Sequence, residues 1–409
     1  MYAGCASPGT SSSGETASTG TADEDTAGTS ATTTGGSTTL GTTGSEPDSP
    51  VWPDGPLDIV PWGDVVFTRS YDGRSVLMTV NRDGSGLGPI YDGGGYADVS
   101  ADGSLLMWRD VDALFVLAQD GAAAEQRPAI VEPTWGPTGA MLAGFDAGTL
   151  VATDESDGSP LVELAGLRSP RALTWSPEGT AIAFQDNEFV FVVDLSTGAS
   201  ELVATSAQSV QLAWAADQSQ IAMGSEGWIV LVDLELLTST QLFEVVGYSD
   251  PKGPFVSWSP TQEWIAWVSD DGNGRGGLGR PDGTLTGPHP TGLDFYEGTP
   301  RWTHDGSWVA FVSSESGHGC FEVWGCLGVS FLQPTAHEDL VYLPAVGEIE
   351  WSSSRPEALV AGPRIIENEL TASRVRLYDI ESRESLDLSD LDSTDPRADQ
   401  GATWRVTSG

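Results

Sequence analysis

The sequence predicts an all-β protein, and three observations support this. Short runs of β-branched and aromatic residues alternate with turn signals of Gly, Asp and Pro along most of the chain. No segment of ten or more residues keeps the 3.6-residue apolar period of an amphipathic helix. One pattern, a tryptophan followed by a short polar turn and an apolar triplet, recurs roughly every 40 residues.

The repeat is clearest in the copies that begin at Trp175, Trp258 and Trp302. Weaker copies begin at Val99, Trp135, Trp214 and Trp351. Turn residues divide the first copy into four predicted strands, at 173–175, 181–184, 189–194 and 200–204. One four-stranded sheet cannot cover both of its faces, whereas sheets stacked around an axis bury both. The repeat therefore predicts a single β-propeller of four-stranded blades, with the repeated tryptophans packed between blades.

The copy at Trp175 reads Trp-Ser-Pro-Glu-Gly-Thr-Ala-Ile-Ala-Phe. This motif is similar to the TolB-type, WD-like repeats of bacterial propellers, and the resemblance covers roughly residues 97–361. The resemblance implies a periplasmic or surface scaffold that binds proteins or peptides. It implies no reaction.

The two ends of residues 57–409 complete one another. Segments 65–67, 75–81 and 87–91 resemble the second to fourth strands of a unit that has no first strand. Segment 402–406 resembles a first strand with nothing after it. Pairing the two ends closes the ring without an open sheet edge. This predicts eight blades, or seven if the stretch 348–400 is an insertion.

Residues 6–56 are rich in Ser, Thr and Gly and hold few large apolar residues, so we expect a disordered linker. Before them, Ala3-Gly4-Cys5 resembles the lipobox of bacterial lipoproteins, in which the Cys becomes the acylated N-terminus. The resemblance implies a lipid attachment segment at 1–5 and a place in the bacterial cell envelope, in the periplasm or at the outer-membrane surface. Tyr2 departs from the usual Leu, and a signal peptide is absent, as a start upstream of Met1 would explain. An incidental cysteine in a flexible tail is the alternative.

The charge limits the class of partner. The chain has 59 Asp+Glu against 18 Lys+Arg, a formal net charge of −41. This acidity argues against nucleic-acid binding and against docking on anionic lipid through a basic patch. We expect a monomer with a protein or peptide partner, basic in character, and membrane contact only through a lipid at Cys5.

Cys320 and Cys326 lie six residues apart across a predicted hairpin, within reach of a disulfide. An exported protein favours this bridge, which leaves no free thiol if Cys5 is acylated. A zinc site with His318 and His337, or free thiols, are the alternatives, although the spacing matches no standard zinc finger.

No sequence motif indicates catalysis. The chain lacks a Gly-x-Ser-x-Gly elbow, and His337-Glu338 is not followed by the second His of a zinc peptidase. His304 occupies a turn position and is expected to be exposed. The Asp/Gly clusters at 154–158 and 270–274 do not follow calcium-loop spacing, so solvated turns are expected rather than calcium sites. The sequence predicts no cofactor and no metal.

Two long insertions, 270–291 and 313–334, mark the expected recognition region, and loop variation without function is the alternative. The second carries Phe321, Trp324 and Phe331, the predicted partner-binding residues. The leading hypothesis is a non-catalytic scaffold for a protein or peptide. The alternative is a propeller that binds or processes glycans, with a non-anchor aromatic such as Trp228, Trp264 or Trp324 as the sugar platform.

Overall fold

The structure is a computed structural model. It describes residues 62–404 except 72–73, 94, 96, 111–112, 120–123, 206–210, 246–253, 270–275, 289–292, 296–298, 316–326, 335, 344–347, 353–354, 356, 363–364, 367–368, 371–373 and 390–397. Pro53–Gly409 form one compact unit. The statements below concern the described residues of this unit.

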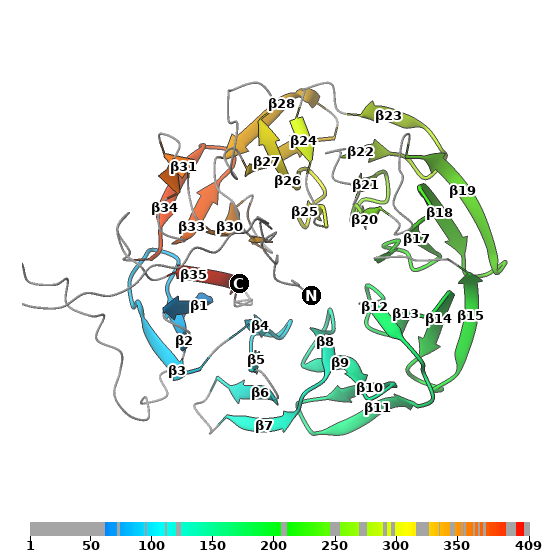
Figure 1. Cartoon of the computed structure of the whole chain (residues 1–409), viewed down its shortest axis with the longest axis horizontal. Helices are drawn as coiled ribbons and strands as arrows, with labels where there is room; N and C mark the ends of the chain where they lie inside the picture. The colour runs from blue at the N-terminus through cyan, green and yellow to red at the C-terminus, as the bar shows by residue number, and fades with distance from the viewer. Residues whose placement is uncertain are drawn as a thin grey trace, which may run out of the picture. The chain divides into compact units, whose positions relative to one another are not determined.

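The described residues form strands and turns, with no α-helix among them. Their strands build eight antiparallel sheets of four or more strands, together with one short hairpin. The sheets follow one another around a ring, each with one strand near the axis and one at the rim (Figure 1). The predicted propeller is therefore confirmed, and the strand pairing gives eight blades.

The blades are numbered along the chain, and their strands are given from the axis outward. Blade 1 contains β35 (Ala398–Trp404), β1 (Val65–Tyr71), β2 (Arg74–Val80) and β3 (Gly88–Asp92). Blade 2 contains β4 (Ala97–Val99), β5 (Leu105–Asp110), β6 (Ala113–Ala118) and β7 (Glu125–Pro128). Blade 3 contains β8 (Val131–Trp135), β9 (Met141–Asp146), β10 (Thr149–Asp154) and β11 (Ser159–Leu164). Blade 4 contains β12 (Pro170–Trp175), β13 (Ala181–Asp186), β14 (Phe189–Asp194) and β15 (Ser200–Thr205).

The second half of the ring has the same plan. Blade 5 contains β16 (Leu212–Trp214), β17 (Gln220–Ser225), β18 (Trp228–Asp233) and β19 (Thr238–Glu244). Blade 6 contains β20 (Phe255–Trp258), β21 (Ile265–Val268), β22 (Gly276–Gly279) and β23 (Leu285–Pro288). Blade 7 has a divided first strand, β24 (Leu293–Phe295) and β25 (Arg301–Trp302), then β26 (Val309–Glu315), β27 (Leu327–Gln333) and β28 (Ala336–Leu343). Blade 8 contains β29 (Glu348–Trp351), β30 (Glu357–Gly362), β33 (Arg374–Asp379) and β34 (Glu384–Asp387), and β31 (Ile365–Ile366) pairs with β32 (Glu369–Leu370) as the short hairpin.

The ring is closed by the last strand of the chain. β35 pairs antiparallel with β1, with Val65 opposite Trp404 and Ser70 opposite Ala398. The expected closing strand was 402–406, and the observed strand begins four residues earlier. The pair includes a buried ion pair, in which Arg69 Nε and Nη2 donate to the two carboxylate oxygens of Asp399 at 2.7 and 3.0 Å. Two segments from opposite ends of the sequence therefore share one blade.

The repeated tryptophans pack between blades, as predicted. Trp175 of blade 4 lies in one core cluster with Ala143, Phe145 and Leu150 of blade 3. The apolar triplet after each polar turn contributes to the same layers, and Ile182, for example, is fully buried. The anchors Trp135, Trp175, Trp214 and Trp258 are more than nine-tenths buried, whereas Trp302 and Trp351 are partly buried. Burial of one large ring per junction fills the space that opens between twisted sheets.

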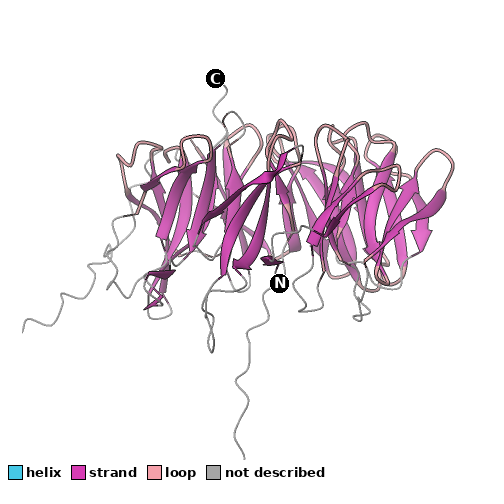
Figure 2. Ribbon diagram, turned by 90° about the horizontal axis from the view of Figure 1, so that it is seen from above, coloured by secondary structure: helices cyan, strands magenta, loops and turns pink. Residues whose placement is uncertain are grey.

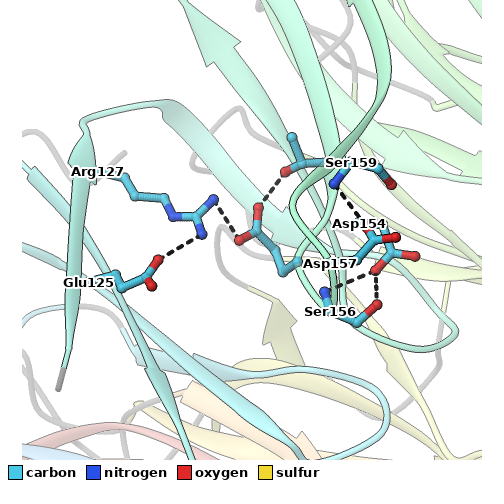
Figure 3. A network of polar contacts seen from close by, with 8 residues as sticks. Glu125, Arg127, Asp154, Ser156, Asp157 and Ser159 are labelled. Atoms are coloured by element: carbon cyan, nitrogen blue, oxygen red, sulfur yellow. Dashed lines mark hydrogen bonds and ion pairs between the residues drawn. The ribbon is translucent and has the colours of Figure 1, made fainter. Parts of the chain in front are cut away.

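An ion pair between charged side chains also joins blades 2 and 3. Arg127 on the outermost strand of blade 2 contacts Glu155 in a turn of blade 3 at 2.7 Å and Glu125 of its own strand at 3.1 Å (Figure 3). The Glu155 side chain is only 1% exposed, so Arg127 compensates a buried carboxylate across the blade junction. The following turn is closed by Asp154 and Asp157, which accept hydrogen bonds from Ser156 and Ser159. The cluster 154–158 is thus a hydrogen-bonded turn, as expected, and the cluster 270–274 lies outside the described residues.

The polar turn of the repeat has a defined hydrogen-bond pattern. In blade 2, Asp102 Oδ1 accepts hydrogen bonds from Ser100 Oγ at 2.7 Å, Ser104 Oγ at 2.7 Å and Ser104 N at 3.0 Å. Partial burial raises the pKa of Asp102, but these donors outweigh it and hold the pKa below its ordinary value. Thr303, Asp305 and Ser307 repeat the arrangement in blade 7.

Asp102→Ala should lower the free energy of unfolding by about 1 kcal/mol at pH 7, since its serine donors can still turn to water. The folded-state pKa lies below the unfolded value of about 3.9. The stabilisation is therefore complete above pH 4 and is lost as the pH falls through the folded-state pKa. Urea unfolding of both proteins at pH 7 and pH 3 checks this. A difference that did not narrow at pH 3 would show that Asp102 acts through something other than its charge.

Candidate functional site

The ring has two faces that differ in how the strands are connected. Because strands alternate in direction, the first-to-second and third-to-fourth connections of every blade leave one face, which we call the turn face. The second-to-third connections and the links to the next blade leave the other, the loop face. Figure 2 shows the strands running between these two faces.

The lengths of the connections separate the two faces. On the turn face no connection is longer than 81–87. The three longest connections between consecutive described strands, 245–254, 316–326 and 388–397, all leave the loop face. The two insertions expected from the sequence, 270–291 and 313–334, begin at this face in blades 6 and 7. The fold thus gives short, repeated turns to one side and variable segments to the other.

The turn face carries fixed negative charge. Seven exposed aspartates, one from each of blades 1 to 7, accept hydrogen bonds within their own turns: Asp83, Asp102, Asp157, Asp194, Asp217, Asp282 and Asp305. Donated hydrogen bonds lower the pKa of each carboxyl, and at Asp102 and Asp305 they do so against an opposing effect of burial. These seven groups stay ionised at any physiological pH.

On the innermost strand of each blade, one residue directly precedes the anchor. The equivalence of these positions is visible in the hydrogen bonds of the anchors, because the indole N–H donates to the backbone carbonyl of that residue in the preceding blade. Five such bonds occur among the described residues: Trp135 to Asp98, Trp175 to Thr134, Trp214 to Thr174, Trp302 to Ser257 and Trp351 to Arg301, at 2.9–3.4 Å. Glu350 and Thr403 hold the same sequence position in blades 8 and 1. The residues at this position are therefore mostly polar.

Asp98 is the unusual member of this set. Its Oδ1 accepts hydrogen bonds from its neighbour Val99 N at 2.8 Å and from Thr403 Oγ1 of blade 1 at 3.2 Å. Burial, followed by the nearby negative charge of Glu350, raises the pKa of Asp98 to about 7, against the hydrogen bonds and Arg301. Asp98 can hold or release a proton near neutral pH, whereas the turn-face aspartates cannot.

The structure places the sequence-predicted site residues as follows. Phe331 is fully buried in β27 and stacks on Tyr378 of blade 8, with ring centroids 5.5 Å apart. It is a core residue, and its prediction as a partner-binding residue is wrong. Cys5, Cys320, Cys326, Phe321 and Trp324 lie outside the described residues. His304 is exposed in its turn, as expected.

The proposed sugar platforms can also be placed. Trp264 is 4% exposed, and the Arg280 guanidinium lies 4.5 Å from its ring centre. Trp228 is partly buried against the core between blades 4 and 5. Trp264 is therefore enclosed, Trp228 is partly exposed, and Trp324 is not described. Among the described residues, no three His, Cys, Asp or Glu side chains are arranged to hold a metal ion. No helix in that part of the chain is long and apolar enough to cross a membrane.

Comparison with known proteins supports the fold. No family model and no curated protein matches the sequence. Among solved structures, the dihydro-heme d1 dehydrogenase NirN in complex with DHE is similar, with a TM-score of 0.56, 14% identity, and coverage of 85% of this chain and 76% of that chain. A eukaryotic initiation factor is similar with a TM-score of 0.52, 12% identity, and coverage of 79% and 84%. TolB from Acinetobacter baumannii, at a TM-score of 0.40, 12% identity and coverage of 73% and 81%, is too distant to carry an argument. These similarities concern the fold alone: the protein is an all-β propeller.

Proposed function

We propose that this protein is a non-catalytic propeller scaffold that binds a protein or peptide partner at its loop face. The observation that carries the proposal is the division of connections, because every connection of ten residues or more leaves the loop face. Recognition on rigid scaffolds concentrates in variable loops that the scaffold holds in place. The turn face, built from short hydrogen-bonded turns, offers little freedom for such variation.

Within the loop face, we assign the partner contact to the connection between β26 and β27. That connection contains Phe321 and Trp324, and aromatic side chains are the usual anchors of protein interfaces. We further propose that a disulfide between Cys320 and Cys326 restrains the segment. Such a restraint reduces the entropy that binding would otherwise remove.

The proposal includes a location. A lipid on Cys5 and the linker 6–56 would tether the propeller, 57–409, to a bacterial envelope membrane. The lipobox-like Ala3-Gly4-Cys5 and the Ser/Thr-rich linker support this. A net charge of −41 favours a basic partner, mainly through faster association. Retention of the partner should then weaken as salt rises.

Replacing 316–326 with a Gly-Ser segment of equal length should abolish capture of a partner from native envelope extracts. The matched control replaces the turn-face connection 234–237, which carries the exposed Leu236 and Leu237, and should leave capture intact. Both proteins are compared by thermal unfolding, so that a folding defect is recognised. Capture that survives the first replacement but not the second would contradict the assignment. Binding and turnover on a glycan array would contradict the non-catalytic class.

A further inference from the structure

The outermost strand of blade 4 departs from the plan of the repeat at one exposed position. Five blades have a third strand of six residues, namely β6, β10, β14, β18 and β33. The third residue of each of these strands pairs with a residue of the outermost strand: Phe115 with Gln126, Val151 with Glu163, Phe191 with Leu202, Val230 with Gln241 and Arg376 with Asp387. All five partners on the outermost strands are exposed, and four of them are polar. Blade 4 instead places a leucine at this position, and Leu202 is 48% exposed.

Leu202 belongs to a larger apolar surface. Directly opposite residues of two antiparallel strands lie on the same face of the sheet, as do residues two apart on one strand. Leu202, Phe191 and Phe189 therefore share one face of blade 4. Phe189 is 36% exposed, and its ring centroid lies 6.5 Å from that of Phe191. Phe191 in turn stacks on the buried Phe184, with ring centroids 5.6 Å apart, so these side chains extend the core to the surface.

Blade 3 contributes to the same surface. Two leucines of β11 are partly buried and pack against the core cluster that Phe191 also contacts. The outermost strands β11 and β15 both lie at the rim of the ring (Figure 1). Phe189 begins β14 directly after the loop-face connection 187–188, so the surface reaches the loop face. We call this surface the rim patch, and its five side chains are Leu161, Leu164, Phe189, Phe191 and Leu202.

Acidic residues border the rim patch. Glu163, Glu188 and Glu201 are exposed, and each directly precedes a residue of the patch in the sequence. Arg168, in the link between blades 3 and 4, is exposed as well. The Arg171 guanidinium is engaged within blade 4, where it donates to Gln185 Oε1 and to the backbone carbonyl of Asn187. The border therefore holds more negative than positive charge.

This charge argues against a second copy of the chain as the occupant. Two copies would bring the same acidic borders together, and each copy carries a net charge of −41. A segment with basic residues would instead meet charge of the opposite sign.

We propose that the rim patch binds a segment of a partner protein in which a large apolar side chain is flanked by Lys or Arg. This inference rests on the proposed scaffold function and adds a contact that does not involve 316–326. Contiguous exposed apolar side chains inside a polar border are typical of protein contacts. The apolar side chain of the partner would pack against Phe189 and Leu202 and leave water, while its basic neighbours would lie near Glu188 and Glu201.

Selection from a library of random dodecapeptides displayed on phage, carried out on the immobilised full chain, tests the proposal. The recovered peptides should contain Leu, Ile, Phe or Trp beside Lys or Arg, and their binding should weaken as salt rises. Leu202→Gln introduces the residue type that blades 2 and 5 have at this position. It should weaken binding of these peptides roughly 10- to 100-fold, as expected for the loss of one buried leucine side chain.

The matched control is Leu386→Gln, at a leucine on β34 of blade 8 that is 43% exposed. This variant should bind the recovered peptides as the wild type does. Both variants should unfold at the wild-type temperature, because each replaced side chain is exposed.

Two results would overturn the proposal. One is a selection that yields no peptide whose binding Leu202→Gln weakens. The other is a set of Leu202-dependent peptides that lack basic residues. The Gly-Ser replacement of 316–326 separates this inference from the proposed function. Peptides that lose binding in that replacement but not in Leu202→Gln contradict the rim patch and leave the proposed function standing, whereas peptides that depend on Leu202 and not on 316–326 support the rim patch.

Discussion

Replacing Asp399 by alanine should lower the free energy of unfolding by about 3–5 kcal/mol, because it leaves the Arg69 guanidinium buried without its carboxylate. Arg69 is 3% exposed and Asp399 is fully buried. The two side chains meet through two hydrogen bonds at 2.7 and 3.0 Å. They join β1 to β35, so the substitution acts at the point of ring closure. Urea unfolding of the full chain at pH 7 measures the loss.

The same blade offers a matched control. Arg74 and Asp92 also form an ion pair, at 2.9 Å, but their side chains are 39% and 44% exposed. Asp92→Ala should therefore cost less than about 1 kcal/mol. Replacing Arg69 and Asp399 together by Met and Leu should cost much less than Asp399→Ala, because no charge is left unpaired. Equal losses from Asp399→Ala and Asp92→Ala would show that the buried pair does not hold the closing strand.

Deleting residues 398–409 should have a still larger effect: loss of the cooperative unfolding transition together with aggregation. The deletion removes β35 and exposes β1, whose backbone groups would then be free to pair with another chain. Calorimetry and size-exclusion chromatography measure the two effects. Deleting only 405–409, which follow β35, should leave the transition unchanged.

A peptide of residues 398–409 added to the truncated chain should restore part of the transition, since it supplies the missing strand. A truncated protein that melts as the full chain does would show that closure through β35 is not required for the fold.

The blade plan could be predicted because each unit carries its own local signals. The turn Ser-Pro-Glu-Gly after Trp175 and the buried triplet Ile182-Ala183-Phe184 occur side by side in the sequence, and both were placed correctly. The incomplete units at the two ends predicted the closure for the same reason. The start of the closing strand at Ala398 was missed, because 398–401 lacks the apolar alternation that marks a strand.

What the sequence could not reveal depends on neighbours that are distant along the chain. The Arg69–Asp399 pair joins residues 330 positions apart, and no local pattern marks either residue as buried. Phe331 was misplaced because its burial depends on Tyr378 of the next blade. Asp98 had one usable signal, its position directly before Val99, the anchor site without a tryptophan. The importance of that position becomes clear only once β35 is known to lie beside β4.

The claim that one face of the ring binds the partner can be tested by photo-crosslinking in native envelopes. A photoreactive amino acid is placed either at Trp324, in the loop-face connection of blade 7, or at His304, in an exposed turn-face connection of the same blade. We expect a covalent adduct with a second protein from position 324 and none from position 304. An adduct from position 304 alone would place the partner on the turn face and contradict the proposed function.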